Sequence, residues 1–354
     1  MEISFIIPVY NGEKYIKSCV TSILKWQKQP KIEILIINDG SVDNTEQICE
    51  ELTQWDSRVK LFNIANSGQG IARNYGLERS TGKYIYFVDA DDWVDTEQIY
   101  RAWEAAEREH ADVVMGGYFR VNGTQKERVH LPGEGLMKRN GTLSQQKLFH
   151  MVKTESAFGY VWNKLYRREF LIQNHLQMDD IYRVYMEDQL FNLKVWSKNP
   201  VWYCCDYALY YYEIGNMSTT RKAEPQIQTK NLAMITELIS YLEENRGMEE
   251  NLDLVTALIM RTFCWSMIKN IEYEGKSVNK IKERAEAYIH TESVQRVLRM
   301  KGALRSLCQL PSLLQTTFYS LCFLLIRWRM SQLIAVMFSW GYPIMKRYVV
   351  RVVK

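Results

Sequence analysis

The sequence predicts an α/β fold with a mostly parallel central sheet, followed by a helical C-terminal extension. In residues 1–120, continuous apolar strands alternate with amphipathic helices, an order typical of a parallel sheet covered on both faces. From Pro225 onward, the apolar residues recur at helical spacing instead. The chain of 354 residues can hold more than one domain, and its content of 47% hydrophobic and 24% charged residues is globular.

Five apolar runs are rich in β-branched or aromatic residues, the types that pack best on a pleated surface. These runs predict strands at Ile3–Val9, Ile32–Ile37, Val59–Ile64, Tyr84–Val88 and Asp112–Tyr118. Apolar residues at helix spacing predict helices at Gly12–Trp26, Val42–Trp55, Gly70–Ser80 and Thr96–His110.

The middle of the chain is less regular. The polar, glycine-containing stretch from Tyr118 to Gly141 is predicted as a loop, and Leu143–Thr154 as a helix. Asp188–Ser197 is predicted as a helix and the aromatic run Tyr203–Tyr212 as a strand. Further helices are predicted at Pro225–Asn245, Asn251–Glu274, Val278–Ile289, Ser293–Leu307 and Leu313–Ile326.

Polar side chains follow each of the first four predicted strands, at the point where the strand ends. In open α/β sheets, ligands bind at the carboxyl ends of the strands, so we expect these residues to share one crevice. They are Tyr10, Asn11, Asp39, Ser41, Arg73, Asp89, Asp91 and Asp92, and Pro8 and Gly68 are assigned to the same crevice.

Three carboxylates stand almost together after the fourth strand, at Asp89, Asp91 and Asp92. Like charges so close repel one another, and a divalent cation is the usual compensation. Carboxylate oxygens suit Mg²⁺ or Mn²⁺, often together with substrate phosphates. The alternative is an acidic helix N-cap, with Asp92 or Asp95 capping the helix that follows.

The other strand-end residues suggest a nucleotide. Tyr10 offers a ring for a base to stack on, and Asp39 can accept a hydrogen bond from a ring N–H such as that of uracil. Gly68 permits close approach of the backbone, and Arg73 can meet a phosphate. Each also has a plainer reading as a packed ring, a turn or an ion pair. There is no G-x-x-x-x-G-K-[ST] and no G-x-G-x-x-G after the first strand, so neither a P-loop nor a dinucleotide fold is predicted.

Four blocks of sequence resemble the inverting family 2 glycosyltransferases of the GT-A fold. The blocks are FIIPVYNGEKYI, IINDGSVDNT, NSGQGIARNYGL and GKYIYFVDADDWV, in that order. The resemblance implies a nucleotide-sugar donor, and the stacking and Asp39 arguments favour UDP. Tyr10 matches the residue that stacks on the base, and Asp39 the residue that binds its ring N–H.

The resemblance also assigns the three acids. Asp89 matches the first acid of the D-x-D motif, near ribose and metal, and Asp91 matches the second, which coordinates Mn²⁺ or Mg²⁺ on the diphosphate. Asp92 extends the motif toward the donor sugar. Pro8, Asn11, Ser41, Gly68 and Arg73 are assigned to the same donor site.

Two later blocks resemble the acceptor side of family members from bacterial capsule, exopolysaccharide and lipopolysaccharide synthesis. They are FGYVWNKLYRREFL, from Phe158, and MEDQLFNLKVW, from Met186. The Glu187–Asp188 pair matches the E-D motif, whose Asp is the catalytic base, and Trp162 and Lys164 are assigned with Glu187 to the acceptor side.

The chemistry agrees with this assignment. The acceptor alcohol must lose its proton as it attacks C1 of the sugar, and a carboxylate can take that proton. A cation stabilises the diphosphate leaving group. The alternative for Glu187 and Asp188 is two acids in the first turn of a helix, favoured by the helix dipole, and both readings can hold together.

We therefore expect a catalytic domain at residues 1–222, with a donor-binding half at 1–120 and an acceptor half at 121–222. A helical region follows at 223–354. Processive synthases of the same fold carry a Q-x-x-R-W motif; Arg327–Trp328 occurs here, but position 324 is Leu and no long apolar spans are found. Transfer of a single hexosyl or N-acetylhexosaminyl unit is therefore expected.

The C-terminal tail has an uneven charge. Residues 293–354 contain ten Lys and Arg and no acid, which leaves −6 for residues 1–292 of a chain with net charge +4. Leu313–Ile326 is too short to span a bilayer and is predicted as a helix lying on an anionic leaflet, with Trp328, Trp340 and Tyr342 near the headgroups. The alternative is a bundle whose basic face is only solvated. Nucleic acid is not expected, because no recognised module is present.

The cellular location is predicted from the cysteines and from the N-terminal apolar run. The seven cysteines are scattered without a C-x-x-C, so we expect reduced thiols, and the five histidines lack zinc-ligand spacing. Ile3–Val9 is too short for the apolar core of a signal peptide. We expect a cytoplasmic protein, peripheral on the inner face of the membrane, with a lipid-linked glycan as acceptor.

Two competing functions remain at this point. A nucleotidyltransferase would also use a nucleotide and acids, but PVYNGEKY is a poor substitute for its basic glycine-rich loop. The other is a catalytically inactive nucleotide-sugar binder or a membrane scaffold for polysaccharide assembly, and the intact Asp89, Asp91 and Asp188 argue against it.

Overall fold

The computed structural model describes residues 1–27, 31–131, 135–137, 158–184, 186–214, 227–309 and 313–353. The chain divides into two units. The first comprises residues 1–141, 157–182 and 186–218, and the second comprises residues 142–156, 183–185 and 219–354. The predicted helix Leu143–Thr154 and the predicted domain boundary at residue 222 lie outside the described residues.

Four parallel strands form the N-terminal half of the sheet in the first unit. They are β1 (Ile3–Val9), β2 (Ile32–Asp39), β3 (Val59–Ile64) and β4 (Tyr84–Phe87). They lie in the order β3-β2-β1-β4, and each neighbouring pair is parallel. Every residue of β1, β2 and β4 is buried, which explains why these strands are almost continuously apolar.

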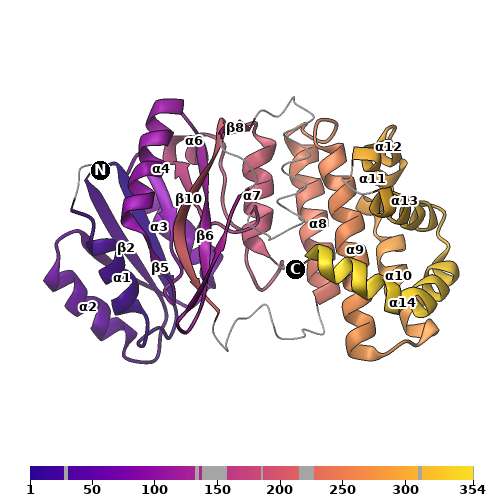
Figure 1. Cartoon of the computed structure of the whole chain (residues 1–354), viewed down its shortest axis with the longest axis horizontal. Coiled ribbons are helices and arrows are strands. Elements are labelled where there is room, and N and C mark those ends of the chain that lie inside the picture. The colour runs from indigo at the N-terminus through magenta and orange to yellow at the C-terminus, as the bar shows by residue number, and fades with distance from the viewer. Residues whose placement is uncertain are drawn as a thin grey trace. The chain divides into compact units, whose positions relative to one another are not determined.

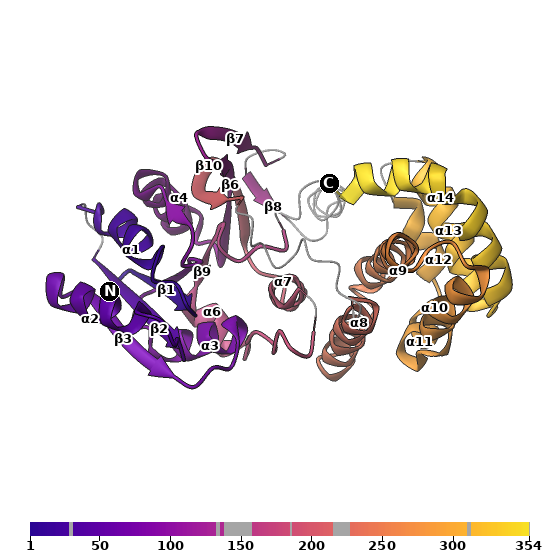
Figure 2. The same cartoon turned by 90° about the horizontal axis from the view of Figure 1, so that it is seen from below.

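Helices cover both faces of this part of the sheet (Figure 1). The connecting helices are α1 (Ile16–Leu24), α2 (Thr45–Trp55) and α3 (Gln69–Arg79). Figure 2 shows α1 and α3 on opposite faces of the strands. The chain runs outward from β1 to β3 and then returns to β4 on the other side of β1. At such a reversal, the carboxyl ends of neighbouring strands border a crevice.

The rest of the sheet is mixed, so the prediction of a mostly parallel sheet holds only for its N-terminal half. β9 pairs antiparallel with both β4 and β6, and β6 pairs parallel with β10. The remaining strands are β5 (Trp93–Val94), β6 (Val113–Asn122), β7 (Gln125–Val129), β8 (Gly135–Met137), β9 (Lys164–Arg167) and β10 (Trp202–Glu213). The helices of this part are α4 (Thr96–Glu109), α6 (Arg168–Gln173) and α7 (Glu187–Ser197).

The predicted loop from Tyr118 to Gly141 is wrong in its first part, where β6 and β7 form an antiparallel hairpin. Gly123 makes the turn with φ +59°. Four of the five residues of β7 are exposed. An exposed edge strand of charged residues has no apolar pattern, so the sequence gives no signal for it.

The second unit consists of helices. They are α8 (Ile227–Glu244), α9 (Leu252–Glu274), α10 (Val278–His290), α11 (Glu292–Arg299), α12 (Ala303–Ser306), a short 3₁₀ helix η2 (Leu307–Gln309), α13 (Leu313–Arg327) and α14 (Ser331–Val353). The predicted helix Ser293–Leu307 is divided into α11 and α12 because Met300 is extended and Gly302 has φ +96°. Among the described helices, none is long and apolar enough to cross a bilayer.

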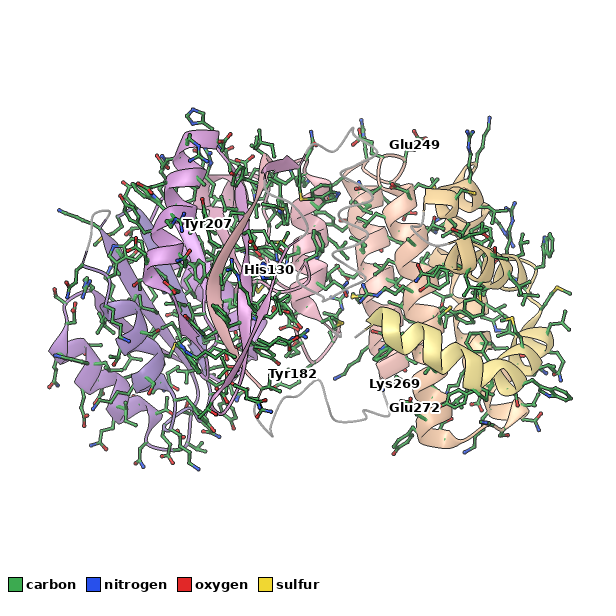
Figure 3. The ribbon with its side chains drawn as sticks, in the orientation of Figure 1. His130, Tyr182, Tyr207, Glu249, Lys269 and Glu272 are labelled. Atoms are coloured by element: carbon green, nitrogen blue, oxygen red, sulfur yellow. The ribbon has the colours of Figure 1, made fainter. Side chains whose placement is uncertain are left out.

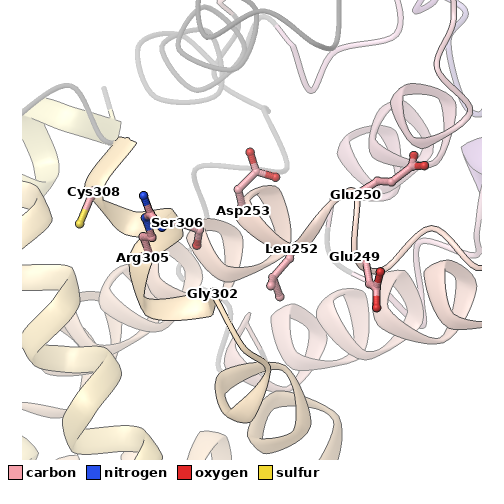
Figure 4. A pocket seen from close by; sticks show the side chains of 8 residues that line it. All are labelled: Glu249, Glu250, Leu252, Asp253, Gly302, Arg305, Ser306 and Cys308. Atoms are coloured by element: carbon pink, nitrogen blue, oxygen red, sulfur yellow. The ribbon is translucent and has the colours of Figure 1, made fainter.

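One pocket of the second unit has a volume of about 560 Å³ (Figure 4). Its walls come from the segment that leads into α9 and from the α12 region. No residue that the sequence assigns to the donor or acceptor lines it. The lining residues are Glu249, Glu250, Leu252, Asp253, Gly302, Arg305, Ser306 and Cys308.

Candidate active site

The buried side chain of Arg73 joins two carboxylates that the sequence assigns to different roles. Its Nη2 donates to Asp89 Oδ1 at 2.6 Å, and its Nη1 donates to Asp188 Oδ1 at 2.8 Å. Arg73 lies on α3, Asp89 follows β4, and Asp188 lies in the first turn of α7. The alternative reading of Arg73 as an ion pair therefore holds, but the pair lies in the interior and not at the surface, since Arg73 is only 1% exposed. Both Nη atoms bind carboxylates, and contact with a donor phosphate stays a prediction.

Glu187 belongs to the same cluster. Its Oε1 accepts a hydrogen bond from Gln69 Nε2 at 2.5 Å and lies 3.6 Å from Arg73 Nη1. These contacts hold the N-terminus of α7 against the start of α3. Met186, directly before them, has a left-handed φ of +61°, which is costly for a non-glycine residue and is held by its surroundings. Glu187 and Asp188 do occupy the first helical turn, where the dipole favours acids.

The surroundings of Asp188 suit a general base. Burial raises the pKa of Asp188 to about 8; Arg73 opposes this rise, whereas Glu187 and Asp89 add to it. A base is most effective when its pKa lies near the working pH. An ionised Asp188 carboxylate can accept the proton of an alcohol, and its role as the catalytic base stays a prediction.

The three acids after β4 differ in their surroundings. Asp91 is exposed, whereas Asp92 is buried and accepts a hydrogen bond from Glu213 N at 2.8 Å. Asp92 Oδ2 is buried and has no hydrogen-bond partner among the described residues. Burial raises the pKa of Asp92, and the charges of Asp89 and Asp91 add to this rise. The residue that caps α4 is Asp95, which accepts from Gln98 N at 3.1 Å.

This donor set fits a divalent cation that a substrate also helps to hold. The ligands are hard carboxylate oxygens, and Asp92 Oδ2 is buried without a hydrogen-bond partner among the described residues. No cluster of three or more acidic, His or Cys side chains in the described part of the chain is arranged to hold a metal ion. Mg²⁺ in particular is commonly held by one or two carboxylates and by phosphate oxygens.

The carboxylate of Asp39 holds the loop that follows β3. It accepts from Ser67 N at 2.8 Å, Ser67 Oγ at 3.1 Å and Gly68 N at 2.9 Å. Gly68 has φ +87°, a conformation that favours glycine and leads into α3. A carboxylate has about four acceptor sites, so Asp39 retains capacity for a ring N–H. Its contact with a base stays a prediction.

Tyr10 presents its ring at the end of β1, where its side chain is 52% exposed. The next residue, Asn11, ties this end to the loop after β2. Its backbone N–H donates to Ser41 Oγ at 2.9 Å, and its Oδ1 accepts from Val42 N at 2.9 Å. Pro8 is buried within β1, opposite Ile37 of β2, and therefore packs in the sheet just before Tyr10. An exposed ring on a fixed corner is suited to stacking.

Tyr182 was not identified from the sequence, because nothing in its local pattern distinguishes it. Its hydroxyl donates to Asn66 Oδ1 at 3.3 Å, and its ring is exposed in the segment before α7 (Figure 3). A Cβ on Gly68 would lie 3.0 Å from Ile181 Cγ2 and 3.4 Å from the Tyr182 ring. The segment before α7 thus covers the loop that Asp39 holds.

The two remaining acceptor-side residues lie in the interior. Trp162 is 2% exposed, and its ring is stacked at 4.4 Å from those of Tyr160 and Tyr210. Lys164 is fully buried and donates to Asn163 Oδ1 at 2.8 Å and to the Tyr160 carbonyl. Burial lowers the pKa of Lys164, and the charge of Asp188 opposes this. Direct contact of either residue with an acceptor stays a prediction.

Comparison with known proteins identifies the family. The family model described as glycosyl transferase family 2 matches residues 4–174. The uncharacterized glycosyltransferase EpsJ of Bacillus subtilis is 34% identical over 221 residues, which are 62% of each chain. The chain thus spans less than two thirds of that relative. The putative glycosyltransferase EpsH of the same organism is 30% identical over 260 residues, 70% of this chain and 71% of that protein.

A solved structure shares the fold. Staphylococcus aureus TarS 1-349 in complex with UDP-GlcNAc has a TM-score of 0.68 and 21% identity, covering 96% of this chain and 92% of that one. TarS is named a poly(ribitol-phosphate) beta-N-acetylglucosaminyltransferase. The predicted fold and family are therefore confirmed: this chain belongs to glycosyltransferase family 2 and has the GT-A fold followed by a helical region.

Proposed function

We propose that this protein is an inverting glycosyltransferase that moves one sugar from a UDP-sugar to an acceptor hydroxyl. The observation that carries the proposal is the cluster in which Arg73 holds Asp89 and Asp188 together. It unites a donor-site acid and a base candidate from segments far apart in the sequence. The UDP-GlcNAc bound to TarS, a protein of the same fold, supports a UDP-linked hexose or N-acetylhexosamine as donor.

The residues of the donor half hold the UDP-sugar in place. Tyr10 offers its exposed ring to the base, and Asp39 fixes the loop over which the nucleotide lies. Asp91 and Asp89 would hold Mn²⁺ or Mg²⁺. When bound, such a cation offsets the negative charge that develops on the departing diphosphate. Asp92 is buried beside them and faces the donor sugar in this proposal.

In the acceptor half, Asp188 takes the proton of the acceptor hydroxyl. As the acceptor oxygen attacks C1 and the bond from C1 to the diphosphate breaks, the acceptor proton passes to an Oδ atom of Asp188. Arg73 keeps that carboxylate in place. A single displacement on the face opposite the leaving group inverts C1, and no covalent intermediate is needed.

The test is Asp188→Asn, which keeps the shape of the side chain and removes the base. We expect sugar transfer to fall by about 10²–10⁴-fold, the usual contribution of general base catalysis. Binding of UDP-sugar, followed by the melting-temperature shift, should remain. Asp206→Asn, which changes an exposed carboxylate on β10, is the control. Wild-type turnover by Asp188→Asn would remove Asp188 from the mechanism.

Surface composition supports a membrane partner. Trp340 is 82% exposed and Trp328 63%, within the acid-free and basic C-terminal part. Exposed apolar rings together with net positive charge suit an anionic leaflet. We therefore propose that the protein acts as a peripheral enzyme at the cytoplasmic face, where its acceptor would be a lipid-linked glycan in cell-surface polysaccharide synthesis.

An inactive nucleotide-sugar binder or scaffold is the alternative. It predicts donor binding without turnover. Hydrolysis of UDP-glucose, UDP-galactose or UDP-GlcNAc in the presence of Mn²⁺ distinguishes an enzyme from a binder, because slow transfer to water needs the same donor activation. Absence of hydrolysis with every donor and either metal would favour the binder.

A further inference from the structure

One arginine of the second unit has no partner for its charge. Arg261 lies on α9, and its Nη1 atom is buried without a hydrogen bond. In the part of the chain that the structure describes, no hydrogen bond or ion pair engages its guanidinium group. The side chain as a whole is half-buried, so the rest of it reaches the surface. A buried cation without an anion is costly, so this position calls for an explanation.

Arg261 belongs to the packed face between α9 and α13. Cys264, one turn after Arg261 on α9, has its Sγ 4.0 Å from the Sγ of Cys322 on α13. Tyr319 lies one turn before Cys322 and is buried. Burial lowers the pKa of Arg261, and Tyr319 is the ionisable group whose charge opposes this. Arg261 and Tyr319 are therefore neighbours in one buried cluster.

α13 adds a second unpartnered atom to this cluster. Gln315 lies one turn before Tyr319, on the same face of α13. Its Oε1 atom is buried and has no hydrogen bond within the described residues. Nη1 of Arg261 is a donor and Oε1 of Gln315 is an acceptor, so the two atoms need partners of opposite kinds. A bound molecule with both an acceptor and a donor would supply them.

The missing partner of Arg261 is an anion from outside the chain. Water would supply hydrogen bonds but would leave the charge uncompensated. Residues 293–354, which include α13, contain no Asp or Glu, so this side of the cluster has no acid to offer. Arginine binds phosphate oxygens through its fork of N–H donors, and a phosphate group that carries a hydroxyl also has a donor for Gln315.

We infer that Arg261, Gln315 and Tyr319 form a binding site for a phosphate group. Arg261 meets the phosphate oxygens, and the uncharged Gln315 and Tyr319 meet the hydroxyl groups or oxygens beside them. The site lies in the second unit and does not depend on sugar transfer. A lipid headgroup and a small soluble phosphate share this chemistry. Leu313 and Leu314, which are 84% and 56% exposed at the start of α13, favour the lipid.

The test compares melting temperatures of the full chain with and without phosphate ligands. The probes are sodium phosphate and the short-chain lipid dihexanoyl phosphatidylglycerol below its micelle-forming concentration, each against sodium chloride at equal ionic strength. A ligand that binds only the folded state raises the melting temperature. We expect a rise of about 2–4 °C with at least one probe at about ten times its dissociation constant, and none with chloride.

Arg261→Met tests the site through two effects of opposite sign. Methionine keeps an unbranched apolar side chain and removes the buried charge. Without ligand, the variant should therefore melt at or above the temperature of the wild type. With ligand, it should lose the rise that the wild type shows. Arg261→Gln, which also removes the charge, repeats the comparison if the methionine variant does not fold.

Arg296→Met is the matched control. Arg296 belongs to the same unit, but Glu243 already binds its guanidinium group at 2.7 and 2.8 Å. Its charge is compensated within the chain, so its removal should leave the rise with phosphate in place. The same loss in both variants would mean that general positive charge, and not the cluster around Arg261, attracts the probe.

The two probes distinguish the sources of the phosphate. A rise with the lipid alone assigns the site to a membrane headgroup, whereas a rise with inorganic phosphate shows that a soluble phosphate suffices. Either result supports the site if Arg261→Met abolishes it. The inference is overturned if neither probe raises the melting temperature, if chloride acts as phosphate does, or if Arg261→Met keeps the full rise.

Discussion

At the residue scale, Arg73 is the central side chain of the site. It is buried and binds Asp89 and Asp188 at 2.6 and 2.8 Å, so one cation offsets the charge of the donor acid and of the base. Removal of one partner of such a buried pair is expensive, because the remaining charges are left uncompensated. Arg73 also lowers the pKa of Asp188 relative to the effect of burial alone.

We expect Arg73→Gln to move the activity profile to higher pH. Arg73 opposes the rise that burial causes in the pKa of Asp188, which stands at about 8. Without the cation this pKa rises further, so the ionised base appears only at higher pH. The acidic limb of kcat/KM should shift upward by about one pH unit or more. A shift of one unit corresponds to about 1.4 kcal/mol of interaction between the cation and the carboxylate.

The measurement is kcat/KM from pH 6 to 10 for the wild type and the variants. Arg73→Lys keeps a cation and should shift the limb less. Arg167→Gln, which removes an arginine paired with Asp112 at 3.4 Å, should leave the limb in place. An unmoved limb in Arg73→Gln would show that Arg73 does not control the base.

At the element scale, the loop between β3 and α3 shows how backbone geometry shapes the donor site. Asp39 holds this loop by three hydrogen bonds, and Gly68 supplies a φ of +87° at its end. The segment before α7 lies against it, because Ile181 is within 3.0 Å of a Cβ placed on Gly68. A small change at Gly68 therefore strains the loop and displaces its cover.

We expect Gly68→Ala to weaken UDP-sugar binding several-fold and to cost about 1–3 kcal/mol of stability, because Gly68 has a backbone conformation that only glycine adopts readily. Gly123→Ala is a matched control, since Gly123 also has positive φ but has open space around its Cβ position. It should lose stability without losing donor affinity. Calorimetric binding and thermal melts measure both effects, and equal donor affinity in the two variants would contradict the expectation.

At the scale of the whole molecule, positive charge is concentrated in the C-terminal part of the chain. Residues 293–354 hold ten cations and no acid within a chain of net charge +4. Single exposed apolar residues are ordinary on protein surfaces, but large rings within a basic, acid-free region suggest a lipid surface. Such binding combines burial of apolar side chains with attraction that salt screens.

We expect the double variant Trp328→Ser, Trp340→Ser to bind anionic vesicles about tenfold more weakly, because two interfacial rings are lost. Vesicles of phosphatidylglycerol and phosphatidylcholine in a sedimentation assay measure this. Trp55→Ser alters a similarly exposed tryptophan, 62% exposed on α2, and is the control. Binding should also fall with salt. Equal loss in both variants, or none in either, would contradict a membrane surface at α13 and α14.

The elements that the sequence predicts well are those with a clear local pattern of apolar residues. The four parallel strands were predicted to within two residues, because burial on both faces leaves continuous apolar runs, whereas α1 begins four residues later than predicted and α2 three. β7 was missed because its exposed charged residues carry no such signal, and the break at Gly302 was missed because helix spacing continues across it. Asp95 rather than Asp92 proved to be the helix cap, a choice that propensity alone left open.

The sequence by itself determined the fold class, the family and the set of acids at the strand ends, since periodicity and motif order are local properties. Only the tertiary structure decided which of these polar groups meet. Arg73 lies 16 residues from Asp89 and 115 from Asp188, and no local pattern reports a contact across such separations. The reason is physical: local spacing specifies which side chains are buried, whereas the crossing of α3, β4 and α7 specifies which buried charges become partners.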